Sequence, residues 1–256
     1  MIDIERAKKE FEKYTSNYDP EQPRVKLKIN HIGRVIENCK KIAESLKLSE
    51  EDIKLAMLLG YFHDIGRFEQ VRIADTFSDR ESGINHAMMS CKVLFEDGLI
   101  KNFLDTDEYN EIIRKAILNH NRYKIEDGLT ERELLFAKLI RDADKLDIFY
   151  SITVEDMNAI FWYKGFDDIE ISEKLMNDYK NHDCLNYADI HTNADQIVTF
   201  YAYVYDLYFD ISKNILKNSD NLDKFKLRAL EYFKSPKIHE QLDVIDSIYH
   251  DYIKNS

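Results

Sequence analysis

The sequence predicts an all-α protein. Its apolar residues recur at intervals of three and four, the spacing that places them on one face of a helix. Seven glycines and three prolines in 256 residues leave few interruptions between helices. No strand-like alternation flanked by Asn-Gly or Asp-Gly turns occurs. We therefore expect one helical domain over residues 1–256, in which residues 151–256 form a helical extension packed on the first part.

Six helices are predicted in the first half, and several begin at a recognisable signal. Ser49 with Asp52, and Thr130 with Glu133, have the spacing of capping boxes, in which side chains bond to the free backbone groups of the first turn. The two prolines within residues 18–23 separate the first two helices. In chain order the helices are expected at about 3–15, 26–46, 49–64, 84–95, 106–120 and 130–148, with a loop at 73–83.

The second half remains helical from Ser151 onward. Aromatic and apolar residues between Phe200 and Ile211 predict one long helix, and such a stripe is more typical of core packing than of a ligand-binding wall. Pro236 is expected to separate the last two helices.

The stretch 61–67 is the part of the chain around which we expect the rest to be organised. The apolar run 55–59 predicts a buried helix before it, and Gly66 predicts the stop at the helix C-terminus. His63 and Asp64 are adjacent polar residues that are costly to bury alone. They either face solvent at the helix end or converge there on one ion.

Four histidines and two aspartates are expected near helix ends or on inward helix faces. A single inward histidine is usually a satisfied core residue, but six such groups would make an unfavourable core unless a cation neutralises them. A divalent metal is the simplest such cation, and imidazole with carboxylate suits Zn, Mn, Fe, Co or Ni. The six residues, spread over five predicted helices, are His31, His63, Asp64, His86, His120 and Asp144.

Composition argues against several classes of function. The chain has 36 Lys and Arg against 48 Asp and Glu, so its net charge of −12 disfavours duplex nucleic acid as a partner but permits a small phosphorylated substrate. No run of 18 apolar residues occurs, so no membrane partner is expected. Three widely spaced cysteines and an N-terminus without an apolar signal segment indicate reduced thiols and a cytoplasmic location.

The order His31, then His63-Asp64, then Asp144 resembles the H…HD…D pattern of the HD-domain superfamily of metal-dependent phosphohydrolases. The resemblance covers roughly residues 25–150 and includes the helix order and the spacing between these residues. It implies an HD-domain helical bundle as the metal-binding core, with a C-terminal helical extension. It also implies that these four residues hold one metal ion.

His86 and His120 resemble two additional histidines found in binuclear members of the superfamily. The resemblance then implies that Asp64 bridges two metal ions. The expected cofactor is therefore one or two divalent ions, Mn, Fe, Ni, Co, Zn or Mg. Asp144 is aligned as the ligand because it follows a small residue, and Asp142 would be a structural group or a partner of a ligand.

The resemblance implies hydrolysis of a small phosphate ester, such as a nucleotide or related phosphomonoester, with Asp64 and Arg67 as catalytic residues. A divalent metal lowers the pKa of water and polarises a phosphoryl oxygen. Charge that develops on the phosphoryl oxygens requires nearby cations. Arg67, Arg80 and Lys145 are the candidate substrate-binding cations, although each is equally compatible with an ion pair within the protein.

Three other functions remain open. A cyclic-nucleotide-type phosphodiesterase is disfavoured by residues 121–124, which lack the second histidine and glycine-rich tail of such enzymes. A di-iron oxygenase of the same fold would use the same six ligands. A non-catalytic, metal-stabilised sensor would bind the metal without an open coordination position.

Overall fold

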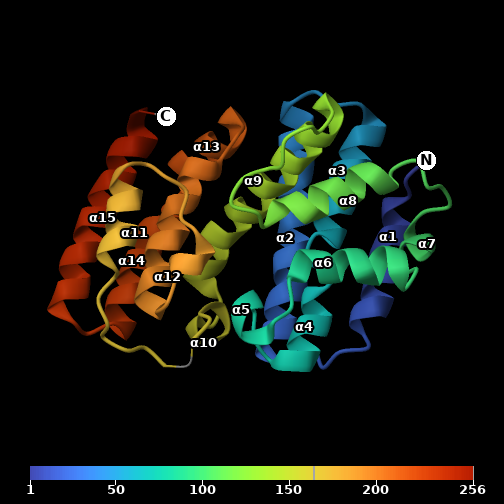
Figure 1. Cartoon of the computed structure of the whole chain (residues 1–256). Coiled ribbons are helices and arrows are strands. Elements are labelled where there is room, and N and C mark those ends of the chain that lie inside the picture. Colours follow the sequence, from blue (N-terminus) through green and yellow to red (C-terminus); the bar gives the residue numbers. More distant parts are fainter. Residues whose placement is uncertain (164, 256) are drawn as a thin grey trace. The chain divides into compact units, whose positions relative to one another are not determined.

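The structure is a computed structural model that describes residues 1–163 and 165–255. Within these residues all regular secondary structure is helical and no strand occurs, which confirms the predicted fold class (Figure 1). The chain divides into two compact units, Met1–Asp147 and Ile148–Ser256. The packing of residues 151–256 on residues 25–150 as one domain stays a prediction.

The first unit contains nine helices that belong wholly to it and the first part of a tenth, α9. These elements are α1 (Ile4–Thr15), α2 (Pro23–Ser45), α3 (Glu50–Phe62), α4 (Arg67–Ala74), α5 (Asp79–Ser82), α6 (His86–Cys91), the π-helix η1 (Lys92–Glu96), α7 (Ile100–Phe103), α8 (Asn110–His120) and α9 (Glu131–Val154). Both predicted caps are present. The Ser49 hydroxyl accepts a hydrogen bond from the Asp52 backbone N–H at 3.2 Å, and the Thr130–Glu133 pair is reciprocal, at 2.7 and 3.3 Å.

The centre of the first unit is the pair α2 and α3, which lie side by side (Figure 1). A Cβ at Gly60 of α3 would lie 2.9 Å from the Ile36 Cα atom of α2, so the two backbones approach too closely for a larger residue. Helices α1 and α8 pack on α3, α4 packs on α2, and α6 packs on both α4 and α8. The end of α3 is therefore surrounded by the helices that carry the predicted ligands.

The sequence predictions for residues 73–95 need correction. The expected loop at 73–83 contains helical structure, because α4 continues to Ala74 and α5 forms a further turn. Ser78 begins that turn by accepting a hydrogen bond from the backbone N–H of Glu81 at 3.2 Å. The helix expected at 84–95 begins only at His86, where the Asn85 side chain caps it, and it ends as the π-helix η1.

The second unit contains the remaining helices. Within it, α11, α12, α13 and α14 all pack against α15. The remaining helices are α10 (Met157–Ile160), α11 (Glu173–Lys180), the 3₁₀ helix η2 (Tyr187–Asp189), α12 (Asn193–Ala202), the 3₁₀ helix η3 (Tyr203–Asp206), α13 (Asp210–Lys217), α14 (Asn221–Tyr232) and α15 (Pro236–Asn255). Pro236 is the first residue of α15, which confirms the predicted separation of the last two helices.

The prediction of one long helix over residues 200–211 is wrong. Helix α12 ends at Ala202, a 3₁₀ turn follows, and Leu207 has an extended backbone before α13 begins. Aromatic residues are weak helix formers, and an aspartate such as Asp210 favours the first turn of a new helix. Apolar spacing continues across the break because residues on both sides are buried, so the pattern alone did not reveal it.

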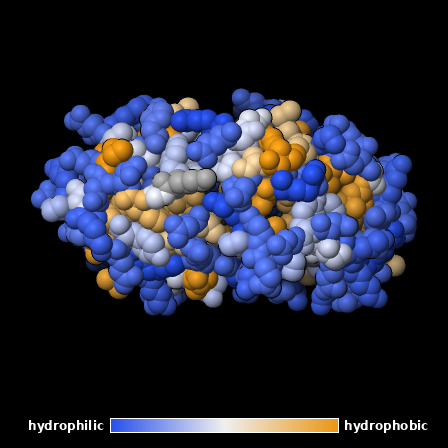
Figure 2. Space-filling view, turned by 90° about the horizontal axis from the view of Figure 1, so that it is seen from below, coloured by the Kyte–Doolittle hydropathy of each residue, from blue (hydrophilic) through white to orange (hydrophobic). Residues whose placement is uncertain are grey.

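The surface seen in Figure 2 is largely hydrophilic, with exposed apolar side chains in patches between polar ones. This distribution agrees with a formal net charge of −12. Within the described residues, no helix combines the length and the apolar character needed to cross a bilayer.

Gly66 has a different structural role from the predicted helix stop. Its φ of −72° is an ordinary right-handed value, and α3 has already ended at Phe62. A Cβ at Gly66 would lie 2.3 Å from the backbone nitrogen of Ser90 in α6. The Gly66 N–H donates to the Ser90 hydroxyl at 2.9 Å, and that hydroxyl donates to the carbonyl of His63 at 3.0 Å. Gly66 therefore permits α6 to contact the end of α3.

We expect Gly66→Ala to lower the free energy of unfolding by at least about 1–3 kcal/mol, because the new methyl group must push α6 away. Gly33→Ala is the matched control: Gly33 lies inside α2 and a Cβ there meets nothing within 4 Å, so the change should be neutral or stabilise by up to about 1 kcal/mol. Urea unfolding followed by circular dichroism measures both. Equal stability of the two variants would contradict this account of Gly66.

Candidate metal centre

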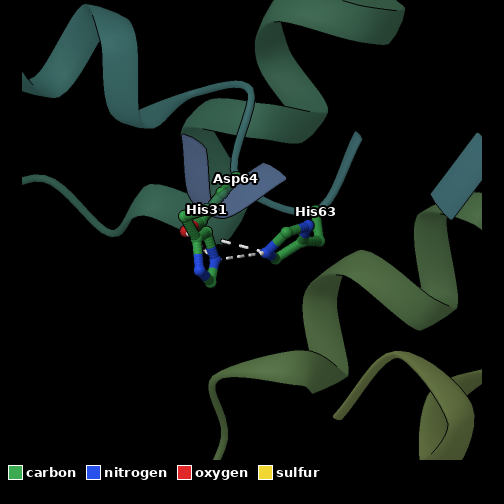
Figure 3. Close-up of side chains that lie close together, drawn as sticks. All are labelled: His31, His63 and Asp64. Atoms are coloured by element: carbon green, nitrogen blue, oxygen red, sulfur yellow. Dashed lines mark hydrogen bonds and ion pairs between the residues drawn. The ribbon is translucent and has the colours of Figure 1, made fainter. Parts of the chain in front are cut away.

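One group of predicted ligands meets beside the end of α3. His31 comes from α2, His63 and Asp64 directly follow α3, and Asp144 comes from α9. The Asp64 Oδ2 atom lies 3.6 Å from the Nε2 atom of His31 and 3.7 Å from that of His63 (Figure 3). The Asp144 Oδ1 atom lies 3.2 and 3.7 Å from the same two nitrogens. We call these four atoms the first ligand set.

A second group uses the other oxygen of Asp64. Its Oδ1 atom lies 3.7 Å from the Nε2 atom of His86, the first residue of α6. The same oxygen lies 3.6 Å from the Nε2 atom of His120, the last residue of α8. We call these three atoms the second ligand set. Asp64 is thus common to both sets and presents one oxygen to each.

The hydrogen bonds of the histidine Nδ1 atoms determine which nitrogen faces the centre. His63 and His120 donate from Nδ1 to the carbonyls of Gly60 and Ile117, at 2.9 and 2.6 Å. A carbonyl only accepts hydrogen bonds, so in the neutral ring Nε2 carries the lone pair. The Nδ1 atom of His31 likewise faces a carboxylate oxygen at 2.6 Å, and that of His86 faces one at 2.7 Å.

Two pairs of lone pairs therefore face each other. The Nε2 atoms of His31 and His63 are 3.2 Å apart, and those of His86 and His120 are 3.1 Å apart. Between neutral rings such an arrangement is repulsive unless positive charge lies beside the nitrogens. Burial by itself would lower the pKa of His31, but hydrogen bonds to Asp144 and Asp147 raise it, and the Arg67 Nη2 atom lies 3.3 Å from the Nε2 atom of His86, so both pairs attract positive charge. Within the described part of the chain, the buried Asp64 Oδ1 atom also has no hydrogen-bond partner. Both observations show that the donor atoms fit metal ions.

Burial and charge keep most of these groups in the form that binds metal. Burial lowers the pKa of His63. Burial together with the Arg67 guanidinium lowers the pKa of His86 to about 4. Both rings are therefore neutral at pH 7. Burial by itself would raise the pKa of Asp64, but Lys28, His63 and Arg67 hold it well below its usual range. A neutral imidazole and an ionised carboxylate are the ligand forms of these residues.

The sequence model of the HD domain family matches residues 29–148. These residues are an HD domain. The matched segment includes every residue of both ligand sets, and the superfamily is of the metal-dependent hydrolase type. No curated protein and no solved structure matches the chain with significant similarity.

Two carboxylates that the sequence prediction missed form hydrogen bonds with ligand histidines of the HD domain. Asp147, 1% exposed at its side chain, accepts the His31 Nδ1 hydrogen bond and is also bound by Arg34. It lies three residues after Asp144 on α9, so helical spacing places both carboxylates on one face, and this signal could have identified it. Asp79 likewise accepts a hydrogen bond from the Nδ1 atom of His86. It lies in the segment predicted as a loop, where helical spacing gives no information.

A buried arginine also supports the HD domain site. The Arg141 Nη1 atom donates to the carbonyls of Asn119 and Arg122, at 2.6 and 2.7 Å. Carbonyls at a helix C-terminus lack partners within the helix, and a cation is favourable there. Arg141 of α9 thereby fixes the end of α8, which carries His120.

Two cations lie beside the Asp64 carboxylate, one at each of its oxygens. Lys28 Nζ forms an ion pair with the Oδ2 atom, and the Arg67 Nε atom lies 3.5 Å from the Oδ1 atom. Both cations also lie over the ring of Phe77, at 5.1 and 5.4 Å from its centroid. Lys28 was missed, although it lies three residues before His31 and hence on the same face of α2.

The remaining predicted residues lie as follows. Arg67 contacts Asp64 and His86, while Arg80 is an exposed residue of α5 and Lys145 a buried residue of α9. Substrate contacts by these three residues stay predictions. Asp142 is fully buried on α9, and Asp144 is the aspartate that faces the histidines, as the alignment with a small preceding residue implied.

We expect Asp147→Asn to weaken divalent-metal binding at the first ligand set by roughly 10–100-fold, because His31 would lose the charge that fixes its orientation. Competition with a chelator measures the affinity. Asp97→Asn is the matched control, since Asp97 is an exposed aspartate paired with Lys92. If both variants bind metal as tightly as the unaltered protein, Asp147 does not position His31.

Proposed function

We propose that this HD domain protein is a metal-dependent phosphohydrolase that cleaves a small phosphate ester, such as a nucleotide or related phosphomonoester, with water. The observation that carries the proposal is the Asp64 carboxylate, which presents one oxygen to each of two ligand sets. Lys28 and Arg67 add positive charge beside it, one at each of its oxygens.

The six side chains of the two ligand sets would hold one or two divalent ions. Four imidazoles with two carboxylates suit Mn, Fe, Co, Ni or Zn better than Mg, which prefers oxygen donors. When bound, such ions supply Lewis-acid activation of water and of the phosphoryl group. Asp147 and Asp79 orient His31 and His86 for this purpose, and the buried end of α3 keeps Asp64 in place.

The two cations provide the electrostatic part of the chemistry. Charge accumulates on the equatorial oxygens of a transferring phosphoryl group, and fixed cations nearby stabilise it. The Lys28 ammonium is carried on a flexible stem and its side chain is 11% exposed, so it is able to move from Asp64 to an incoming phosphate. Contacts of Arg67, Arg80 and Lys145 with the substrate are part of the proposal.

The charge of the whole chain favours a small substrate. A net charge of −12 repels an extended phosphate backbone, whereas one phosphate group requires only local cations. Within the described residues, the metal centre itself supplies those cations in Lys28 and Arg67.

We expect the purified protein loaded with Mn²⁺ to release phosphate from nucleotides or from an aryl phosphate ester, and a chelator to abolish the reaction. Asp64→Asn should lower kcat/KM by at least about a hundredfold, because it removes the charge that both ligand sets share. Circular dichroism of the variant confirms that it is folded.

A protein that binds metal but releases no phosphate from a broad panel of mono- and diesters would contradict the proposed hydrolase. Release from cyclic nucleotides alone would instead identify a phosphodiesterase. Oxygen consumption with a mixed-valence iron spectrum would identify a di-iron oxygenase. Metal binding without any turnover would identify a metal-stabilised sensor.

We expect Lys28→Met to lower kcat/KM for the phosphate ester by roughly 10–100-fold, since a charged hydrogen bond to the phosphate is lost. Lys26→Met is the matched control, because Lys26 is an exposed residue of the same helix. Steady-state kinetics with both variants measures the difference. The role of Lys28 in substrate binding is refuted if the two variants have the same kcat/KM.

A further inference from the structure

The two ligand sets are built differently. We propose that they bind divalent metal with unequal affinity, and that Arg67 is the residue that weakens the second set. The inference rests on the proposed metal centre and concerns the order in which its two sets are filled.

The first difference is the number and charge of the donor atoms. The first set has four atoms, from His31, His63, Asp64 and Asp144, and two of them belong to carboxylates. The second set has three atoms, from two histidines and the shared Asp64. A carboxylate attracts a dication more strongly than a neutral imidazole does, so the first set is favoured by the charge of Asp144.

The second difference is the position of the Arg67 guanidinium. Its Nη2 atom donates a hydrogen bond to the Nε2 atom of His86 at 3.3 Å. Its Nε atom lies 3.5 Å from the Oδ1 atom of Asp64. The guanidinium therefore faces two of the three donor atoms of the second set. A dication bound there would meet a like charge at close range in a buried site, where such repulsion is large.

Arg67 is held in this position by other bonds. Its Nη1 atom donates to the Gln70 Oε1 atom at 2.6 Å, to the Phe77 carbonyl at 2.7 Å and to the Asp79 Oδ1 atom at 3.1 Å. Gln70 is fully buried and bonds in turn to Asp79 at 2.8 Å and to Ser82 at 3.0 Å. Moving the guanidinium away from the second set would break this network, so its charge stays in place.

Lys28, the cation beside the first set, is held much less firmly. It pairs with one carboxylate oxygen and lies over the ring of Phe77, and its four-carbon stem is flexible. An entering metal is able to displace the ammonium from Asp64. Consequently the first set fills at low metal concentration, and the second fills only when metal is abundant.

The experiment is a titration of the metal-free full chain with Mn²⁺, followed by isothermal calorimetry and by electron paramagnetic resonance. We expect one tight ion per chain with the six-line spectrum of an isolated ion. A second ion should bind at least about tenfold more weakly, or not detectably, and should couple magnetically to the first. His120→Ala should remove only the weak event, whereas Asp144→Asn should weaken the tight one.

Arg67→Met should raise the affinity of the second ion by about tenfold or more, because the fixed like charge is gone. Arg67→Lys keeps the charge but loses the guanidinium bonds that hold it in place. It should therefore raise the affinity of the second ion by less than Arg67→Met does. If Arg67→Met does not fold, the wild-type titration and His120→Ala still test the unequal affinity, and Arg67→Gln, which also removes the charge, tests the role of Arg67.

Two ions of equal affinity in the unaltered protein would overturn the inference, as would loss of the tight ion in His120→Ala. An unchanged second affinity in folded Arg67→Met would also overturn it. None of these results affects the proposed hydrolase, which is judged by phosphate release. Failure to bind any metal would overturn both.

Discussion

The shared carboxylate of Asp64 is the constraint on which the rest of the first unit depends. It is buried, it presents an oxygen to each of two histidine pairs, and the lone pairs within each pair face each other. Opposed lone pairs around a buried anion are stable only if positive charge enters between them. The arrangement is therefore compatible with divalent metal binding at both ligand sets.

The surrounding helices are placed so that this arrangement is possible. The missing side chains of Gly60 and Gly66 allow α3 to approach α2 and α6 closely, which brings His31 and His86 to the same carboxylate. Asp147, Asp79 and two backbone carbonyls then fix the four rings. Packing sets the distances, and hydrogen bonds set which nitrogen of each ring faces the centre.

The cations give the site its asymmetry. Lys28 and Arg67 both neutralise Asp64, yet one is on a flexible stem while the other is bound into a buried network with Gln70 and Asp79. The same kind of charge thus serves different purposes. The two cations differ in how many bonds hold them, because the Lys28 ammonium pairs with one carboxylate oxygen and the Arg67 guanidinium also donates to Gln70, Phe77 and Asp79.

The sequence by itself determined the helical fold class, the helix starts at Ser49 and Thr130, and six residues that the structure brings together around Asp64. These features depend on local spacing, which a helix converts directly into a face. Local spacing did not reveal the break after Ala202, since buried residues continue on both sides of it.

Only the tertiary structure decided how the two ligand sets share Asp64 and why residue 66 is glycine. It also decided which carboxylates form hydrogen bonds with the ligand histidines. His31 and Asp147 are 116 residues apart in the chain, and His86 and His120 are 34 apart. Contacts over such separations depend on how whole helices pack, and no periodicity within one helix contains that information.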